Sequence, residues 1–391
     1  MKTYVDISME ILRWVLTHGR IEKLSQDNID LFNSWITGEK KPTFNQVEKI
    51  SKATGIPLGY FFLQVPPVED ISLVQYRTID SVALDNPSRN LIDTLHDMDQ
   101  VQEWMHNTLV SRGGAPLEFV GSLRNQNDPD KAAQEIRDLL GLEDDWFGNS
   151  RVADDSFARI RNAISCIGTI VMMSGIVENN TRRPLDINEF RAFCVVDNYA
   201  PLIFINSNDS INGKLFSLIH EFVHICIGKD SLFNDRYSTG SKVSKTETLC
   251  NAVAAEILVP HLLFVREWNN VAGSESIDVA IDSLARFFKC GITVVARRAY
   301  DNGLIDNNHY QKIAKKAVKL YIDARNKKKE NGDGGGNYYL TAASRIDNRF
   351  FNMLVSSVAE GKTLYSDAFR LTNTNRSTFF TLVDSIRGGV K

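Results

Sequence analysis

The sequence has few cysteines, no long apolar run and little net charge, and each absence excludes a class of protein. Its five cysteines form no CxxC pair, so neither a disulfide framework nor a cysteine-based zinc site is expected. No apolar stretch approaches the ~20 residues that a membrane-spanning helix needs. The opening residues, MKTYVDISME, contain no basic segment followed by an apolar one. We therefore expect a cytoplasmic protein with no membrane partner.

The formal net charge of −3 over 391 residues provides no general attraction for nucleic acid, so any DNA contact must be local. With 43% hydrophobic and 24% charged residues, the composition is that of a globular protein. The chain is too long for one ordinary core, since domains usually hold about 100–200 residues. Several structural units are therefore expected.

Hydrophobic periodicity and turn residues predict an α+β fold that is predominantly helical. Three helices are expected in the first unit, and short strands at Gly168–Met173, Ala192–Val196 and Leu202–Asn206. A basic run and the glycine-rich stretch NGDGGG mark the sharpest boundary, before the last unit. The expected units are a helix-turn-helix-like bundle at 1–65, a helical connecting region at 66–150, a domain with a small sheet beside helices at 151–265, a helix-turn-helix-like region with a basic helix at 266–330, and a helical C-terminal unit at 338–391.

The candidate active site is His220-Glu221-Phe222-Val223-His224. Residues four apart on a helix are rotated by about 400°, so the two imidazoles face the same side one turn apart. That spacing allows both to bind one Zn²⁺, with Glu221 placed to take a proton from a water on the ion. The alternative is a chance motif of satisfied core histidines, but burying such a set without a partner is costly, which favours a metal.

A third protein ligand is expected on the helix that follows the motif, in TETLCNAVAAEILVP. Glu247 and Glu256 are nine residues apart and face opposite sides of that helix, so only one can reach the metal. We predict Glu247, because it shares its face with small residues that allow close packing, and expect Glu256 to point outward. The alternative is that Ser244 and Glu247 form only a capping box. Lesser candidates are Asp230, Asp235 and His261.

These motifs resemble the ImmA/IrrE family of zinc metallopeptidases. LFSLIHEFVHICIG followed by ETLCNAVAAEILVP is similar to that family's HExxH, spacer and ExxxN…AA…L-x-P pattern. The stretches EFRAF and APLIFIN, residues 189–193 and 200–206, resemble its strand region. Upstream, Trp35-x-x-Gly38, Lys41-Pro42-Thr43 and PLGYFF resemble an XRE-type helix-turn-helix fused to longer members.

The resemblance implies that 151–265 is a zincin-like metallopeptidase domain. It also implies cleavage of a protein, typically a helix-turn-helix repressor, in a phage, mobile-element or stress circuit. We therefore expect Zn²⁺, with Mn²⁺ as the alternative ion, and a repressor or antitoxin as substrate. The competing interpretation is a non-catalytic DNA- or repressor-binding regulator with a structural metal site. Three obvious ligands rather than four leave one coordination position for water, which favours the enzyme.

The strand around Ala192–Val196 is the candidate for pairing with an extended substrate, through Phe193, Cys194 and Val195, because peptides often add to an exposed sheet edge. A plain core strand is an equal alternative for this segment.

DNA contact has weak support in the sequence. Residues 1–65 carry a net charge of +1, and the expected recognition stretch holds Asp27 and Asp30, which would repel phosphates. We therefore expect this unit to contact protein rather than DNA. Two further helix-turn-helix-like stretches, 284–303 with Arg297 and Arg298 and 364–380, are more typical of packing, and the lysine-rich run 312–329 also fits a solvated helix face.

Overall fold

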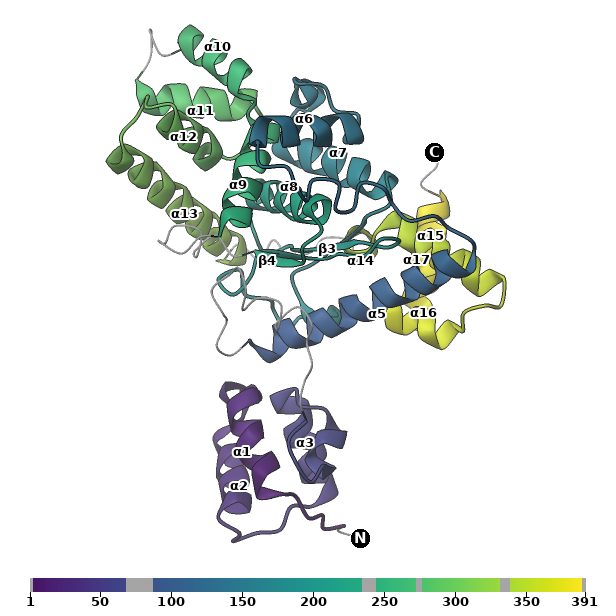
Figure 1. The fold of residues 1–391 in the computed structure, drawn as a ribbon. Coiled ribbons are helices and arrows are strands. Elements are labelled where there is room, and N and C mark those ends of the chain that lie inside the picture. Colours follow the sequence, from purple (N-terminus) through teal and green to yellow (C-terminus); the bar gives the residue numbers. More distant parts are fainter. Residues whose placement is uncertain (1–2, 68–86, 234–243, 272–275, 331–337, 389–391) are drawn as a thin grey trace. The chain divides into compact units, whose positions relative to one another are not determined.

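The structure, a computed structural model, describes residues 3–67, 87–233, 244–271, 276–330 and 338–388. It contains two compact units, one formed by residues 1–75 with 83–96 and the other by residues 76–82 with 97–391. The predicted α+β class is confirmed, because helices predominate and are accompanied by a single small sheet in the described residues (Figure 1).

The N-terminal unit is built on three helices, α1 (Met9–His18), α2 (Gln26–Ile36) and α3 (Phe44–Thr54). Thr43 and Gln46 form a capping box that begins α3, and Gly55 ends it in the left-handed conformation, with φ 76°, that glycine adopts without strain. Apolar residues at helical spacing form a core of their own, which includes Ile11, Val15, Phe32, Val47 and Ile50. This unit therefore has the internal packing of an independent helical bundle.

The larger unit contains a four-stranded mixed sheet in the order β1-β3-β2-β4. Its strands are β1 (Ile170–Ser174), β2 (Ala192–Val195), β3 (Leu202–Asn206) and β4 (Ser231–Phe233). β1 runs parallel to β3, whereas β2 is antiparallel to both β3 and β4. The first three strands occur close to their predicted positions, but β4 was not predicted, since three residues are too few to show an alternating pattern.

The expectation that the strand around Ala192–Val196 offers an edge to substrate is wrong. β2 is an inner strand, paired with β3 on one side and β4 on the other. Phe193 and Cys194 are fully buried and pair across both neighbours, while Val195 pairs with Leu202 of β3. The backbone groups that a peptide would need at Phe193 and Cys194 are thus used inside the sheet, and β4 takes the outer position.

Helices after residue 87 account for most of the remaining fold. They are α5 (Arg89–Ser111), α6 (Pro129–Leu140), α7 (Ala153–Cys166), α8 (Ile211–Ile227), α9 (Lys245–Leu258), α10 (His261–Val271), α11 (Ile277–Phe287), α12 (Ile292–Asp301), α13 (Asn307–Glu330), α14 (Tyr338–Arg345), α15 (Asn348–Ala359), α16 (Tyr365–Leu371) and α17 (Arg376–Gly388). No individual helix among the described residues is long and apolar enough to span a membrane. Taken together, α9 and α10 have the length and composition of a span, but the pair is bent by 56°.

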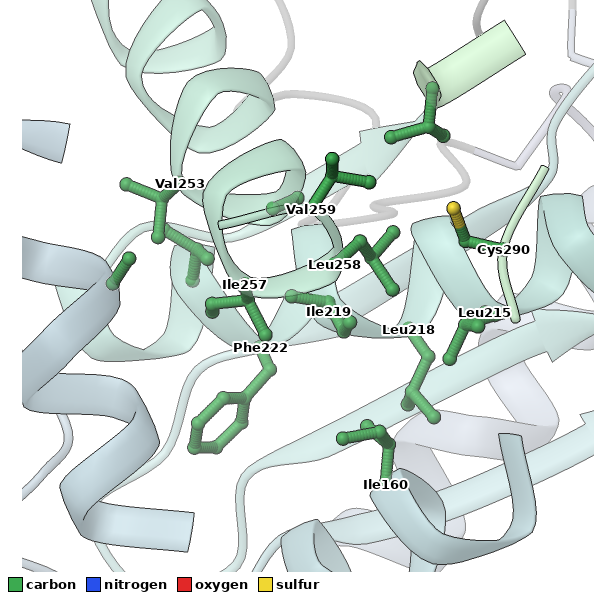
Figure 2. Close-up of a cluster of buried hydrophobic side chains, with 14 of the residues drawn as sticks. Ile160, Leu215, Leu218, Ile219, Phe222, Val253, Ile257, Leu258, Val259 and Cys290 are labelled. Carbon is green, nitrogen blue, oxygen red and sulfur yellow. The ribbon is translucent and has the colours of Figure 1, made fainter. Parts of the chain in front are cut away.

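Helix α8 is the centre of the core. It packs on the sheet and against α7 and α9, and helices α6 to α9 lie on one side of the sheet (Figure 1). Figure 2 shows the apolar side chains that α8 and α9 contribute, among them Leu218, Ile219, Phe222, Val253 and Ile257. Because α8 is buried on nearly every side from Leu215 onward, any polar group on it must find its partner inside the protein.

The C-terminal helices belong to the same compact unit as the sheet and cover the outer strand β1. Asp347 accepts hydrogen bonds from the Val171 backbone N–H (3.2 Å) and the Ser165 hydroxyl (2.7 Å). It also caps α15 by accepting from the Phe350 N–H at 2.9 Å. Arg161 reinforces this junction by donating to the carbonyl oxygens of Val171 and Ile346.

We expect Asp347→Ala to destabilise the larger unit by roughly 2–3 kcal/mol, because it removes a helix cap and leaves the buried Val171 N–H and the half-buried Ser165 hydroxyl without this acceptor. Chemical denaturation followed by circular dichroism measures the effect. Asp130→Ala is the matched control, since Asp130 lies in the first turn of α6 but Asp128 provides the cap there. Equal stability of the two variants would contradict the role given to Asp347.

Candidate metal centre

Two histidines of α8 face each other inside the core. The Nε2 atoms of His220 and His224 are 3.2 Å apart, and both side chains are buried. The helix that carries them begins at Ser210, whose hydroxyl accepts from the Gly213 N–H. It ends at Gly228, which has a φ of 81° and approaches Gly121 so closely that a Cβ there would lie 3.1 Å from the Gly121 Cα. The positive φ and this close approach both favour glycine at the turn that leads into β4.

Glu247 of α9 completes a three-residue cluster. Its Oε2 lies 3.2 Å from His220 Nε2, and its Oε1 lies 3.2 Å from His224 Nε2. The possible ligand atoms of the three residues all lie within 4.8 Å of one another. The structure thus brings together the three residues that the spacing argument selected.

The two interpretations of Ser244 and Glu247 are compatible. The Ser244 hydroxyl caps α9 by accepting from the Glu247 backbone N–H at 3.1 Å. The Glu247 carboxylate, however, points to the histidines instead of completing a capping box. The serine therefore begins the helix while the glutamate reaches the cluster.

The charges of His224 and Glu247 shift each other's pKa values. Burial would raise the pKa of Glu247, but hydrogen bonds and charge from His220 and His224 outweigh burial and hold that pKa far below its usual value. Burial lowers the pKa of His224, but Cys250 and Glu247 beside it raise the pKa well above the ordinary value. Without an ion, the Glu247 carboxylate therefore stays ionised beside a protonated His224 imidazole. A bound cation would supply the positive charge in place of that proton.

Glu221 lies next to the cluster but is not part of it. Its side chain is fully buried, and its Oε2 accepts a hydrogen bond from the Ser231 hydroxyl of β4. Its Oε1 has no hydrogen-bond partner in the part of the chain that the structure describes. A buried carboxylate oxygen without a donor is costly, so this atom is placed to meet a group that enters the site.

The donor set fits a zinc ion. Two imidazole nitrogens and one carboxylate are a common protein ligand set for catalytic zinc, in which the fourth position remains for water or substrate. Among the described residues, no fourth histidine, cysteine, aspartate or glutamate joins the group. His220, His224 and Glu247 are thus the residues that would hold the ion, with Glu221 left outside the coordination shell.

Glu256 does not point outward as expected. It is buried and forms an ion pair with Arg298 of α12, at 2.7 Å. Its other oxygen accepts from the His261 backbone N–H at the start of α10. Glu256 does face the opposite side of α9 from Glu247, as expected. That side is not exposed, however, because α12 packs against it.

The lesser ligand candidates lie elsewhere. Asp230 accepts a hydrogen bond from the Val196 backbone N–H at 2.5 Å. His261 begins α10, where its backbone contacts Glu256. Asp235 is outside the described residues. Neither Asp230 nor His261 is in the His220, His224 and Glu247 group.

Sequence reasoning missed two neighbours of the site. Ser231 contacts Glu221 from β4, and the Cys250 side chain lies against His224 from α9. Cys250 has a weak signal in the sequence, because it follows Glu247 by three residues and so shares its helix face. Ser231 has no such signal, since its position depends on the unpredicted pairing of β4 with β2.

Comparison with known families agrees with this geometry. Residues 178–300, about a third of the chain, match the Peptidase_M78 family model, described as the IrrE N-terminal-like domain. Residues 346–385 match a domain of unknown function, DUF8813. No curated protein matches the sequence. The first match includes His220, Glu221, His224 and Glu247, and it supports a metallopeptidase domain of the IrrE/ImmA type in this segment.

The two glutamates of α9 give a direct test of the cluster. We expect Glu247→Ala to weaken Zn²⁺ binding by more than ~100-fold, beyond the ~10–100-fold that loss of an outer-shell partner costs. Glu256→Gln should keep full metal content and lower stability by about 1–3 kcal/mol, because it disrupts the buried contact with Arg298. Metal content by mass spectrometry and thermal melting measure the two effects. Loss of metal in the Glu256 variant alone would reverse the assignment of the two helix faces.

Proposed function

We propose that the chain is a zinc-dependent metalloendopeptidase that cleaves a helix-turn-helix repressor or antitoxin. The observation that carries the catalytic part is the convergence of His220, His224 and Glu247 beside a buried glutamate, Glu221, that is not a ligand. The IrrE-type peptidase match over the same residues supports it.

The reaction that this arrangement supports is hydrolysis of a peptide bond. When bound, Zn²⁺ supplies Lewis-acid polarisation and lowers the pKa of water in its coordination sphere. Glu221 accepts the proton of the attacking water at Oε1, because Oε2 is already held by Ser231. The same oxygen then passes the proton to the leaving amine. The apolar surroundings of α8 keep other water away from this carboxylate.

A structural metal site is the competing function. Such a site normally uses four protein ligands, whereas three are gathered here within the described residues. A purely structural ion would also have no need of Glu221, which occupies a fully buried position at a cost in free energy. Both features favour catalysis.

We expect Glu221→Gln to retain zinc and the fold but to lose cleavage of the repressor, since the amide keeps the size of the side chain and cannot accept the proton. Rate loss should reach at least ~100-fold, in the range of general acid–base catalysis. Gel-based cleavage of a candidate helix-turn-helix repressor, with metal content measured in parallel, provides the assay. Normal cleavage by the variant, or failure to bind metal, would contradict the assigned role.

The N-terminal unit supports protein recognition more than DNA recognition. Helix α2 contains no Lys or Arg, and its exposed first turns present Gln26, Asp27 and Asp30. The Gln26 amide donates to the Asp30 carboxylate at 2.9 Å, so even this amide is engaged within the helix. A helix in the DNA groove normally supplies basic and amide groups. A domain of this kind is better suited to contact a protein, such as a repressor.

The helix-turn-helix-like pair α11 and α12 also offers little to DNA. Arg298 of α12 is committed to the buried ion pair with Glu256. Arg297 pairs with Asp301 at 3.0 Å and lies over the rings of Tyr300 and Tyr310. Both arginines of the second helix therefore have partners within the protein.

We expect deletion of residues 1–65 to abolish cleavage of the repressor while zinc content stays intact, because the deletion removes the docking unit and spares every metal-centre residue. Cleavage assays and metal analysis of the truncated and full-length proteins measure this. Undiminished cleavage by the truncated protein, with tight and steeply salt-dependent binding of the isolated unit to a DNA duplex, would show a DNA reader instead.

A further inference from the structure

Two buried side chains lie next to Glu221, and neither belongs to the His220, His224 and Glu247 group. Cys194 of β2 and Ser231 of β4 are register partners in the sheet. Cys194 is fully buried and Ser231 is 7% exposed. The Cys194 sulfur lies 3.8 Å from the Ser231 Oγ, and that Oγ contacts the Glu221 carboxylate. The three groups form a chain from the sheet to the carboxylate.

The direction of these hydrogen bonds follows from the chemistry of the groups. The Ser231 O–H donates and Glu221 Oε2 accepts. The Cys194 thiol lies 3.8 Å from the Ser231 oxygen and from the Lys229 carbonyl, to either of which it can donate, and it also interacts directly with the Glu221 side chain. Burial, together with the charges of Glu221 and Asp230, raises the pKa of Cys194 and keeps the thiol protonated as a donor.

We propose that Ser231 is a positioning residue that fixes Oε2 of Glu221 and leaves Oε1 as the atom that carries the proton, with Cys194 supporting the serine hydroxyl. This inference rests on the proposed peptidase function. It assigns Cys194 a supporting contact with Ser231, in contrast to the substrate contact expected from the sequence.

The physical basis is restriction of the Glu221 side chain. A glutamate has three rotatable bonds, and a small rotation would move Oε1 out of reach of the attacking water. Proton transfer requires a heavy-atom separation of about 2.6–3.2 Å. Because β4 is held by β2 through backbone pairing, Ser231 provides a rigid anchor for this carboxylate.

Loss of the anchor should therefore affect the chemical step and leave substrate binding unchanged. We expect Ser231→Ala to lower kcat by roughly 10–100-fold, the usual cost of losing an outer-shell partner, with KM and zinc content unchanged. Ser231→Thr retains a hydroxyl on a strand and should restore most of kcat. Cys194→Ala should cause a smaller loss than Ser231→Ala, because its contact is long.

Matched controls separate this role from general loss of packing. Ser156→Ala removes a buried hydroxyl that has no hydrogen-bond partner among the described residues, and Cys226→Ala removes a buried thiol of α8. Both should retain kcat. If Ser231→Ala cleaves the repressor as fast as the wild type, the positioning role is overturned. It is also overturned if Ser231→Ala raises KM and Ser231→Thr fails to recover activity.

A second readout needs no catalysis. In a double-mutant cycle, the melting temperatures of Ser231→Ala, Glu221→Gln and the double variant should be non-additive, because the two side chains contact each other. Additive shifts would overturn the inference. A wild type that binds zinc but cleaves nothing would instead overturn the proposed function, so the two failures are distinguishable.

Discussion

The contact of one carboxylate with two imidazoles, between α9 and α8, is the interaction on which the larger unit depends. His220 and His224 lie on a helix that is otherwise apolar and buried, where ionisable groups without partners would be costly. Glu247 reaches both from α9. The Glu247 carboxylate must be ionised to pair with the imidazoles or to bind a metal ion. That charge is tolerated inside the core only because α8 and α9 pack closely enough for the three side chains to meet.

The position of α9 is set by carboxylates at both of its ends. Glu247 holds the first turn against α8, and Glu256 holds the last turns against Arg298 of α12. The Glu256 backbone carbonyl also accepts from Arg137 of α6 at 3.4 Å. Between these polar contacts, apolar residues such as Val253 and Ile257 fill the interface with α8 (Figure 2). The metal-centre geometry is thus supported by elements well beyond the HExxH helix.

Much of this organisation could be predicted from sequence, because it depends on local periodicity. The 3.6-residue repeat placed His220 and His224 on one face, and the nine-residue separation put Glu247 and Glu256 on opposite faces. The long-range contacts could not be predicted. The inner position of β2 depends on a three-residue strand, β4, and the burial of Glu256 depends on Arg298, 42 residues further along the chain. Neither pairing leaves a periodic signal.

In the proposed metal centre, His220, His224 and Glu247 would hold a zinc ion and leave one coordination position for water. X-ray absorption at the zinc edge of the full-length protein tests this most directly. We expect nitrogen and oxygen scatterers only, at about 2.0–2.2 Å, with the imidazole pattern of two histidines. A sulfur scatterer near ~2.3 Å would bring a cysteine, with Cys250 the nearest to His224, into the coordination shell. That result would contradict an open catalytic site and favour a closed structural one.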